Sequence, residues 1–485
     1  MRNFPQDSTE KKIGDSQSIL LVSCYELGHQ PAGLAMPLAF LKQAGFDAET
    51  MDMSVEEFDS VKAGRPRFVG ISVPMHTALR LGVQVAREIR KLNPECHICF
   101  YGLYASLNAG YLLSTVADSI IGGEYEEELV RRVKLVFGEA NHTKESAATA
   151  KPVLAKLSFP VPERSQLVSI DRYAKLEHQG EQRLAGYVEA SRGCLHLCTH
   201  CPIPPVYEGR FFVIPEQVVL EDIRRQVASG ARHITFGDPD FLNGPGHALG
   251  VARAMHEEFP DLTFDFTAKI EHILKHPALM PEFAQLGCVF VVSAVESLSD
   301  VVLERLQKGH AREDVSDAFD VLAGAGITLR PSFVSFTPWT TIDDFIEVLE
   351  FVDSHNMIDH VDPVQYSIRL LVPPGSLLLS SPDAERWLGR LVQESFTYEW
   401  THPDQRMDQL QQRVSALVEQ AANVGEDAVS TFDRIRELAY AAKGAPFQPR
   451  NRKLDPFRSR PPRLTEAWFC CAEPTREQFI TLGKK

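Results

Sequence analysis

The chain has 485 residues, with 65 acidic and 50 basic side chains and a formal net charge of −15. This length exceeds what one hydrophobic core usually supports, so we expect several domains. The acidic balance argues against a protein that tracks a nucleic-acid backbone, since such proteins carry a basic face. No stretch approaches the ~18 apolar residues of a membrane span, and residues 1–15 lack the apolar core of a signal peptide. We therefore expect a cytoplasmic protein.

Short apolar runs alternate with helical patterns over residues 18–138. The runs are SILLVSC (18–24), FDAETMDM (46–53), RFVGISVP (67–74), HICFYGLYA (97–105) and the first part of 118–137. Alternation of short buried strands with helices predicts a parallel, doubly wound α/β sheet. Residues 1–138 are assigned to this domain. Residues 139–185, which begin with an aperiodic stretch, are assigned to a linker and lead-in.

A second α/β series occupies residues 186–375. Strands are expected at 186–191, 232–237, 262–267, 288–295, 327–336 and 364–370, with helical patterns between them. Six such units predict a partial (β/α)6 barrel, whose ligands should gather at the carboxyl ends of the strands. Residues 376–485 are predicted to be a helical C-terminal domain, with helices at 383–396, 407–424 and 428–443, followed by an extended tail.

Three of the nine cysteines, Cys194, Cys198 and Cys201, form a C-x3-C-x2-C motif at the end of a predicted strand. Thiols stay reduced in the cytosol, so clustered cysteines indicate a metal site or catalysis. Three thiolates can hold three corners of a [4Fe–4S] cubane and leave the fourth iron open, where S-adenosylmethionine (SAM) can bind. The alternative is a structural zinc site completed by His196 or His200, in a non-catalytic metal-binding protein.

The motif, the Arg-Gly that precedes it and the six-strand series resemble the radical SAM superfamily over about residues 185–375. Residues 18–138 resemble the flavodoxin-like, cobalamin-binding domain of the B12-dependent subgroup. The sequence CCAEP at 470–474 resembles a small group of radical SAM proteins named for a CUAEP/CCAEP tail. The chain is also similar to the radical SAM enzymes of arsinothricin biosynthesis, which transfer the 3-amino-3-carboxypropyl group of SAM to trivalent arsenic.

The resemblance implies several contacts with SAM. After the second barrel strand, GDPDF places residues near the SAM amino group, the fourth strand meets the ribose or carboxylate, and the fifth supplies an arginine suited to a carboxylate. A residue within the cysteine motif covers the adenine. These candidates are Gly237, Asp238, Asp240, Ser293, Glu296, Arg330 and His200. For each one the alternative is a structural ion pair, a solvated loop charge or simple packing.

The first loop of the N-terminal domain can be compared with the sequence motif that binds cobalamin. Cobalamin domains commonly carry Asp-x-His-x-x-Gly, whose histidine ligates the metal, and here His29 and Gly33 are present while Leu27 replaces the aspartate. The carboxylate expected behind a metal-bound histidine is thus missing at that place, although Glu26 is close. Two interpretations remain open: cobalamin is bound without this motif, or the domain only braces the barrel.

The adjacent thiols Cys470 and Cys471 suit a soft ion, because thiolates select soft metals and metalloids. A substrate site for As(III) is one interpretation of this pair. A buried apolar pair, a vicinal disulfide and a redox couple serving the cluster are the alternatives.

These observations predict a radical SAM transferase that uses a [4Fe–4S] cluster and SAM, with an electron donor such as flavodoxin or ferredoxin as partner. The first hypothesis is transfer of the aminocarboxypropyl group to As(III). The second is a cobalamin-dependent methyltransferase acting on a small molecule. All of these reactions require the same three thiolates, so the sequence does not choose among them.

Overall fold

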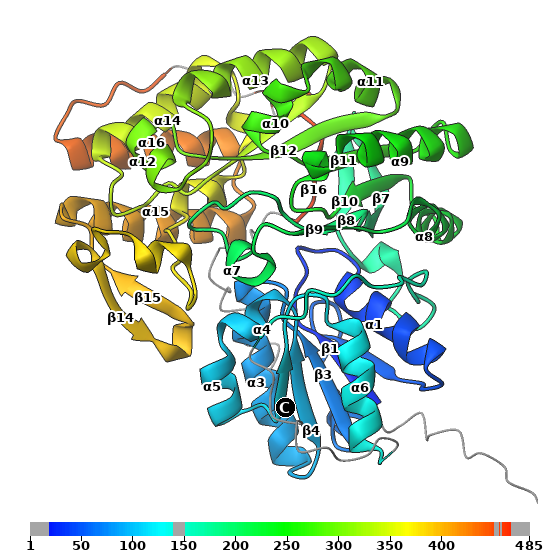
Figure 1. Cartoon of the computed structure of the whole chain (residues 1–485). Coiled ribbons are helices and arrows are strands. Elements are labelled where there is room, and N and C mark those ends of the chain that lie inside the picture. Colours follow the sequence, from blue (N-terminus) through cyan, green and yellow to red (C-terminus); the bar gives the residue numbers. More distant parts are fainter. Residues whose placement is uncertain (1–18, 139–150, 451–454, 456–457, 467–485) are drawn as a thin grey trace, which may run out of the picture.

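The computed structural model describes residues 19–138, 151–450, 455 and 458–466 (Figure 1). Residues 19–138 form a sheet of five parallel strands in the order β2-β1-β3-β4-β5. The strands are β1 (Ile19–Ser23), β2 (Glu49–Asp52), β3 (Phe68–Ser72), β4 (His97–Tyr101) and β5 (Ser119–Ile121). The helices are α1 (Ala32–Gln43), α2 (Ser60–Ala63), α3 (His76–Leu92), α4 (Leu103–Leu107), α5 (Ala109–Thr115) and α6 (Glu126–Val136). The predicted doubly wound, flavodoxin-like order is confirmed.

Apolar side chains on alternating sides of β1 explain why both faces of this sheet are covered. Ile19 and Leu21 belong to one core, shared with α1 and α6, whereas Leu20 and Val22 belong to another, shared with α3. Successive side chains of a strand point to opposite faces, so a continuous apolar run requires helices on both sides.

The second sheet has seven strands in the order β13-β12-β11-β10-β7-β6-β16, and it curls into part of a barrel. The parallel strands are β7 (Glu181–Val188), β10 (His233–Phe236), β11 (Thr263–Thr267), β12 (Cys288–Glu296) and β13 (Thr328–Phe333). Two antiparallel strands, β6 (Lys175–His178) and β16 (Arg463–Leu464), extend the edge beside β7. The connecting helices are α8 (Glu216–Ala228), α9 (Pro245–Glu258), α10 (Ile270–Lys275), α11 (Met280–Gln285), α12 (Asp300–Arg305), α13 (Arg312–Ala325) and α14 (Ile342–Ser354).

The predicted sixth barrel strand at 364–370 is wrong. Residues Pro363–Ser367 form a 3₁₀ helix, and only a single parallel bridge, between Phe336 and Arg369, remains of the strand pairing. The side chain of Gln365 takes over part of the missing ladder, because its Oε1 accepts a hydrogen bond from the backbone nitrogen of Phe333 at 3.1 Å. A side-chain amide thus satisfies a backbone donor that a neighbouring strand would otherwise satisfy.

The predicted helix at 383–396 is also wrong. After a 3₁₀ turn at Ala384–Arg386, the chain forms an antiparallel hairpin of β14 (Leu388–Val392) and β15 (Thr397–Trp400). Phe396 closes the hairpin with a φ of 55° and is buried in the core of the N-terminal domain. The local apolar spacing was compatible with a helix, but burial of Phe396 against the other domain decides the conformation.

The two helices predicted after this hairpin are confirmed as α15 (Gln405–Val424) and α16 (Ala428–Lys443). Each ends at a glycine in the left-handed conformation, Gly425 with φ 63° and Gly444 with φ 74°, as helix C-termini favour. None of the described helices combines the length and the apolar character that a membrane crossing requires. Cys470 and Cys471 lie outside the described residues.

Candidate active site between the two sheets

A cavity of about 450 Å³ lies where the carboxyl ends of the two parallel sheets face each other. On one side it is lined by residues that directly follow strands of the N-terminal domain, such as Gly102 after β4 and Gly123 after β5. On the other side it is lined by residues at the ends of barrel strands, such as Glu296 of β12 and Ser332 of β13. Ligands of open α/β sheets and of barrels bind at this strand end, so the cavity is where both domains would present their ligands.

Two short paired strands enclose the cysteine motif at the base of its loop. β8 (Ser191–Gly193) pairs antiparallel with β9 (Phe211–Val213). Gly193 has a φ of 74°, and a Cβ at this position would lie 2.3 Å from the carbonyl oxygen of Arg210, so only glycine fits. The loop that follows is fastened to the barrel, since the backbone nitrogen of Thr199 donates to the Leu306 carbonyl at 3.1 Å.

The three cysteines of the motif are free thiols on this loop. Cys194 and Cys198 are buried, and Cys201 lines the cavity. Burial raises the pKa of Cys194, and it raises that of Cys201 to about 12, so these side chains are protonated thiols without a metal. Bound iron would deprotonate them, as metals do with thiol ligands. A set of three soft donors without a disulfide fits three corners of an iron–sulfur cube.

Three of the residues expected to contact SAM do line the cavity: Gly237, Glu296 and His200. Gly237 must be small, because a Cβ there would lie 2.0 Å from the Tyr187 hydroxyl. His200 Nε2 lies 3.2 Å from Glu296 Oε1, while its buried Nδ1 has no hydrogen-bond partner. An unsatisfied ring nitrogen beside the cavity is suited to a bound ligand.

The structure does not bring the other expected SAM contacts to the cavity lining. Asp238 accepts from the Ala190 backbone nitrogen at 2.9 Å and from the Ser191 hydroxyl, so it fixes the start of β8. Ser293 lies between Val291 and Val295, which belong to the core beneath the helices. Residues of opposite parity on β12, such as Glu296, reach the cavity.

Asp240 and Arg330 also have partners elsewhere. Asp240 Oδ1 accepts from the Leu242 backbone nitrogen at 3.0 Å, and its other oxygen faces His272. Arg330 forms a buried ion pair with Asp362 at 2.7 Å. Neither side chain is among the residues that line the cavity, so the expected contacts of Asp240 with the SAM amino group and of Arg330 with a carboxylate stay predictions.

Lys308, which no sequence pattern indicates, is buried beside Glu296 of the cavity wall. Its Nζ lies 3.4 Å from Glu296 Oε1. Burial would raise the pKa of Glu296, but Lys308 and His200 outweigh it and lower that pKa to about 2. The sequence offers no signal for this pair beyond the position of Lys308 in a loop twelve residues after Glu296, because the contact is tertiary. The buried ammonium thus keeps Glu296 ionised, and Glu296 offers the cavity an anion suited to a cationic group of a ligand.

His29 of the first N-terminal loop does not line the cavity. Its ring stacks on Tyr187, with centroids 4.5 Å apart, and burial lowers its pKa to about 4. Glu26 lies at the start of α1, where its carboxylate accepts from the Gly33 backbone nitrogen at 3.2 Å. The loop that carries the metal-binding histidine in many cobalamin domains is therefore packed into the protein here.

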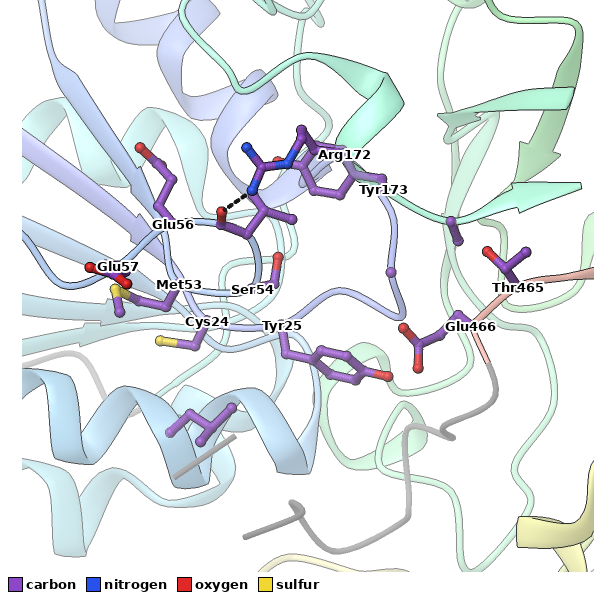
Figure 2. Close-up of a pocket in the computed structure, with 14 residues that line it drawn as sticks. Cys24, Tyr25, Met53, Ser54, Glu56, Glu57, Arg172, Tyr173, Thr465 and Glu466 are labelled. Carbon is purple, nitrogen blue, oxygen red and sulfur yellow. Dashed lines mark hydrogen bonds between the residues drawn. The ribbon is translucent and has the colours of Figure 1, made fainter. Parts of the chain in front are cut away.

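A second cavity, of about 530 Å³, lies at the other half of the same sheet edge, beside the ends of β1 and β2 (Figure 2). The C-terminal segment closes one side of it, since Thr465 and Glu466 are part of its lining. The Thr465 hydroxyl accepts from the Lys175 backbone nitrogen at 2.9 Å, which fastens the segment to β6. Glu56, Glu57 and Glu466 make this lining acidic, so it is a poor fit for a phosphate or carboxylate.

Comparison with known proteins agrees with this geometry. Residues 188–352 match the family model of the radical SAM superfamily, and residues 19–133 match that of the B12 binding domain. The chain thus combines a radical SAM domain with a B12-binding domain.

Solved structures share this arrangement. The cobalamin-dependent SAM radical enzyme OxsB, with aqua-cobalamin and SAM bound, superposes with a TM-score of 0.68 at 16% identity, over 87% of this chain and 72% of that chain. The radical SAM methyltransferase TsrM from Kitasatospora setae gives a TM-score of 0.59 at 16% identity, over 70% of this chain and 71% of that chain. At these identities the likeness establishes the fold.

Two curated relatives match this chain over only part of their own length. The hopanoid C-3 methylase of Methylococcus capsulatus is 24% identical over 329 residues, which are 64% of this chain and 62% of that protein. The tRNA-2-methylthio-N(6)-dimethylallyladenosine synthase of Desulfosudis oleivorans is 28% identical over 204 residues, 39% of this chain and 42% of that protein. The chain therefore spans less than two thirds of the length of both relatives.

Proposed function

We propose that the chain is a cobalamin-dependent radical SAM transferase that moves a methyl group from SAM to a small-molecule substrate. The observation that carries this proposal is the single cavity shared by the carboxyl ends of both sheets, with Cys201 in its wall. A reaction that uses a corrin on one domain and SAM on the other needs both to open into one space. The names of two similar proteins, a methylase and a methyltransferase, support the methyl group as the group that is transferred.

The three thiols of Cys194, Cys198 and Cys201 are the residues that would hold the cluster. When bound, the cluster supplies an electron for SAM cleavage, and cobalamin supplies a carrier for the methyl group. Glu296 and His200 line the cavity and are the polar groups suited to the SAM amino group or ribose, while Lys308 pairs with Glu296 and keeps its carboxylate ionised. Apolar side chains such as Leu103, Ile203 and Val334 line the rest of the cavity and exclude water.

The N-terminal wall of the cavity bears on how cobalamin would be held. The described lining residues of this domain are Ser72, Pro74, Met75, Gly102, Leu103, Tyr104, Gly123 and Tyr125. None of these eight carries an imidazole or a thiol, and His29 lies behind Tyr187. The domain thus offers a corrin a largely apolar wall with glycines near two strand ends, and none of its described lining residues is a histidine. This fit favours cobalamin bound without the histidine motif over a domain that only braces the barrel.

Transfer of the aminocarboxypropyl group to As(III), held by Cys470 and Cys471, is the second candidate. It is supported by the course of the C-terminal segment, which pairs with β6 and reaches the sheet edge at Gly28. Glu466, the last described residue, borders the second cavity four residues before Cys470 in the sequence. A soft-ion site near this edge would use the thiolate chemistry of the pair.

The nucleoside products separate these candidates. The chain should be reconstituted anaerobically with iron, sulfide and cobalamin, then incubated with SAM and a reductant. Methyl transfer yields S-adenosylhomocysteine, and the adenosyl radical yields 5′-deoxyadenosine, whereas aminocarboxypropyl transfer yields 5′-methylthioadenosine. Stoichiometric cobalamin in the visible spectrum together with S-adenosylhomocysteine is the expected result. Methylthioadenosine formed only with As(III) would instead establish the second candidate, and no SAM cleavage at all would leave a non-catalytic metal protein.

A further inference from the structure

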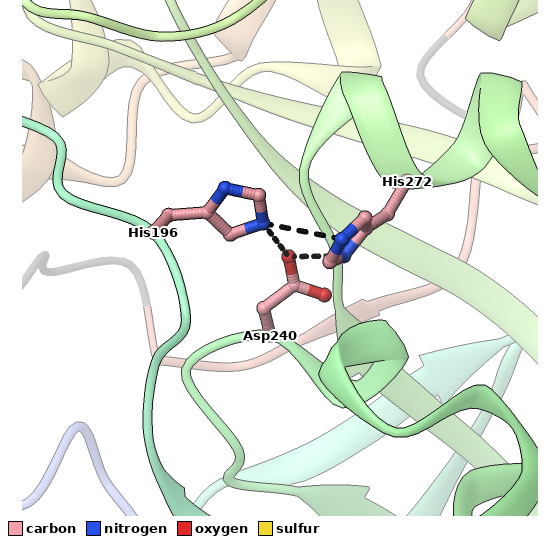
Figure 3. Close-up of side chains that lie close together, drawn as sticks. All are labelled: His196, Asp240 and His272. Atoms are coloured by element: carbon pink, nitrogen blue, oxygen red, sulfur yellow. Dashed lines mark hydrogen bonds and ion pairs between the residues drawn. The ribbon is translucent and has the colours of Figure 1, made fainter. Parts of the chain in front are cut away.

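A group of three candidate metal ligands includes one residue of the cysteine loop: His196, Asp240 and His272 (Figure 3). None of the three is among the residues that line the cavity. They come from separate segments, since His196 lies between Cys194 and Cys198, Asp240 follows β10, and His272 is in α10. Their donor atoms all lie within 4.8 Å of one another.

The distances between these donors are close to those between ligands of one ion. His196 Nε2 lies 3.2 Å from His272 Nε2 and 3.9 Å from Asp240 Oδ2. Asp240 Oδ2 lies 2.8 Å from His272 Nδ1. Tetrahedral zinc with Zn–N bonds of about 2.0–2.1 Å separates its ligand atoms by roughly 3.3 Å. The two short contacts of His272 use different ring nitrogens, and an imidazole ligates one ion through one of them. The His272 ring must therefore turn so that one nitrogen faces both partners, which would place two imidazoles and one carboxylate around one cation.

Burial and unsatisfied polarity provide a second, independent observation. His272 is 6% exposed and Asp240 is 1% exposed. His272 Nδ1 has no aligned hydrogen bond, although the carboxylate oxygen of Asp240 is only 2.8 Å away. The contact of His272 Nδ1 with the Asp240 carboxylate is short but misaligned, and a cation bound between the two side chains would satisfy both of them.

We propose that His196, Asp240 and His272 form a mononuclear site for a divalent first-row transition metal ion, separate from the iron–sulfur cluster. Two imidazoles and one carboxylate suit borderline ions such as Zn²⁺ or Fe²⁺ and leave coordination positions open for water. The ion would join the cysteine loop to the segments that follow β10 and β11. It would thereby help to hold the three cysteines in place through His196 of their loop.

The contact of Lys269 with His196 shows that the hydrogen of the His196 ring must move to its other nitrogen when the ion binds. Its Nζ lies 3.0 Å from His196 Nδ1 and 3.0 Å from Glu271 Oε2. An ammonium can only donate, so in this structure His196 Nδ1 accepts and its Nε2 carries the hydrogen. A metal at Nε2 requires the hydrogen on Nδ1, where Glu271 Oε2, 3.7 Å away, can accept it once Lys269 turns aside. Glu271 then becomes the carboxylate that orients the metal-bound imidazole.

The test uses the full chain with its iron–sulfur cluster assembled, so that the cysteines are occupied. One equivalent of Zn²⁺ is added anaerobically, free ion is removed, and zinc is counted by elemental analysis. The zinc K-edge X-ray absorption spectrum then identifies the ligands. The expected result is one zinc per chain in a shell of nitrogen and oxygen at about 2.0–2.1 Å, without sulfur at about 2.3 Å.

Variants locate the ion. His272→Gln and Asp240→Asn should each weaken zinc binding by more than about 100-fold. His276→Ala is the matched control, because its ring is 6.2 Å from that of His272 but contributes no donor to the group. Iron content and thermal unfolding establish that each variant folds and keeps its cluster.

The wild-type spectrum decides the proposal without any variant. No zinc retained on the cluster-loaded chain would mean that the three side chains are only a hydrogen-bonded set, and zinc with a sulfur shell would place the ion on cysteines. Either result overturns the proposal, as does equal loss of zinc in His276→Ala.

Discussion

Two buried carboxylates near the domain boundary have opposite protonation behaviour, and their partners explain why. Glu296 is buried beside Lys308 and His200, and its pKa is lowered to about 2. Glu26 is buried with only backbone donors and with the carboxylates Asp52 and Glu189 nearby, and burial raises its pKa to about 8. Desolvation acts on both side chains, so the presence of a cation decides which one stays ionised at neutral pH.

The raised pKa of Glu26 predicts a pH-dependent stability. A carboxyl whose folded pKa lies above its unfolded value stabilises the protein at low pH, and the stability is lost as pH rises toward about 8. Glu26→Gln removes this titration. The variant should match the wild type near pH 5 and become the more stable of the two toward pH 8, with the difference growing by up to about 1.4 kcal/mol per pH unit.

Thermal unfolding of both proteins at pH 5, 6, 7 and 8 checks this. A constant difference between Glu26→Gln and the wild type across that range would contradict the raised pKa.

Loss of one cysteine of the motif should have an all-or-none effect on the cluster. Cys198→Ala removes one of only three cluster ligands, so it should abolish the iron–sulfur absorption and SAM cleavage while leaving the chain folded. Cys96→Ala is the matched control, because Cys96 is buried in the apolar core of the N-terminal domain. Iron analysis and nucleoside analysis after anaerobic reconstitution provide the measurement. Full SAM cleavage by Cys198→Ala protein with bound iron would refute the ligand assignment.

The predicted site residues that line the cavity were indicated by signals local in sequence. The cysteine spacing is such a signal, and so are Gly237 and Glu296, which end strands that face the cavity. Asp240 was expected at SAM because it follows a barrel strand, but its carboxylate caps the next turn and faces His272. Lys308 was missed, since nothing in its neighbourhood along the chain indicates the tertiary contact with Glu296.

At the scale of elements, local pattern predicted the parallel strands well because each is a short apolar run between helices. The failures are segments whose conformation depends on distant partners. The hairpin of β14 and β15 is fixed by Phe396 in the other domain's core, and the 3₁₀ helix at Pro363–Ser367 is fixed by Gln365 pairing with β13. Neither partner is detectable in a window of sequence around the segment.

Arg330 on β13 contacts two later segments of the chain. Its guanidinium pairs with Asp362 at 2.7 Å and approaches the Pro462 carbonyl at 3.5 Å, so it braces the segment that leads into β16. Arg330→Met should lower stability by on the order of 1–2 kcal/mol, because it leaves the partly exposed Asp362 with only the longer contact to Arg463 at 4.0 Å. SAM affinity of the folded protein should stay within about twofold.

Adding Asp362→Asn to Arg330→Met should recover part of the loss, because the unpaired charge is then removed. Denaturant unfolding and SAM titration are the measurements. A tenfold loss of SAM affinity with unchanged stability would return Arg330 to the binding site.

At the scale of the whole molecule, buried charge joins the two domains next to the cluster loop. Arg192 of β8 lies 2.6 Å from Glu126 and 3.6 Å from Glu124, both on the N-terminal domain, and 3.0 Å from Glu189. Burial raises the pKa of Glu124 to about 7, although Arg192 counteracts it. Because Arg192 is two residues before Cys194, this contact sets the position of the cysteine loop relative to the N-terminal sheet.

Arg192→Met tests whether this contact holds the domains together. The change leaves two fully buried carboxylates without their cation, so we expect a loss of about 3–5 kcal/mol in the free energy of unfolding. Hydrogen exchange should increase at residues 122–126 and 189–193 together, since both sides of the interface lose their partner.

Arg224→Met is the control, because its pair with Glu258 is exposed and should matter little. Adding Glu126→Gln should restore part of the stability by removing one orphaned charge. Unchanged exchange at both segments in Arg192→Met would show that apolar packing, such as that of Phe396 against the N-terminal core, is enough to hold the two sheets edge to edge.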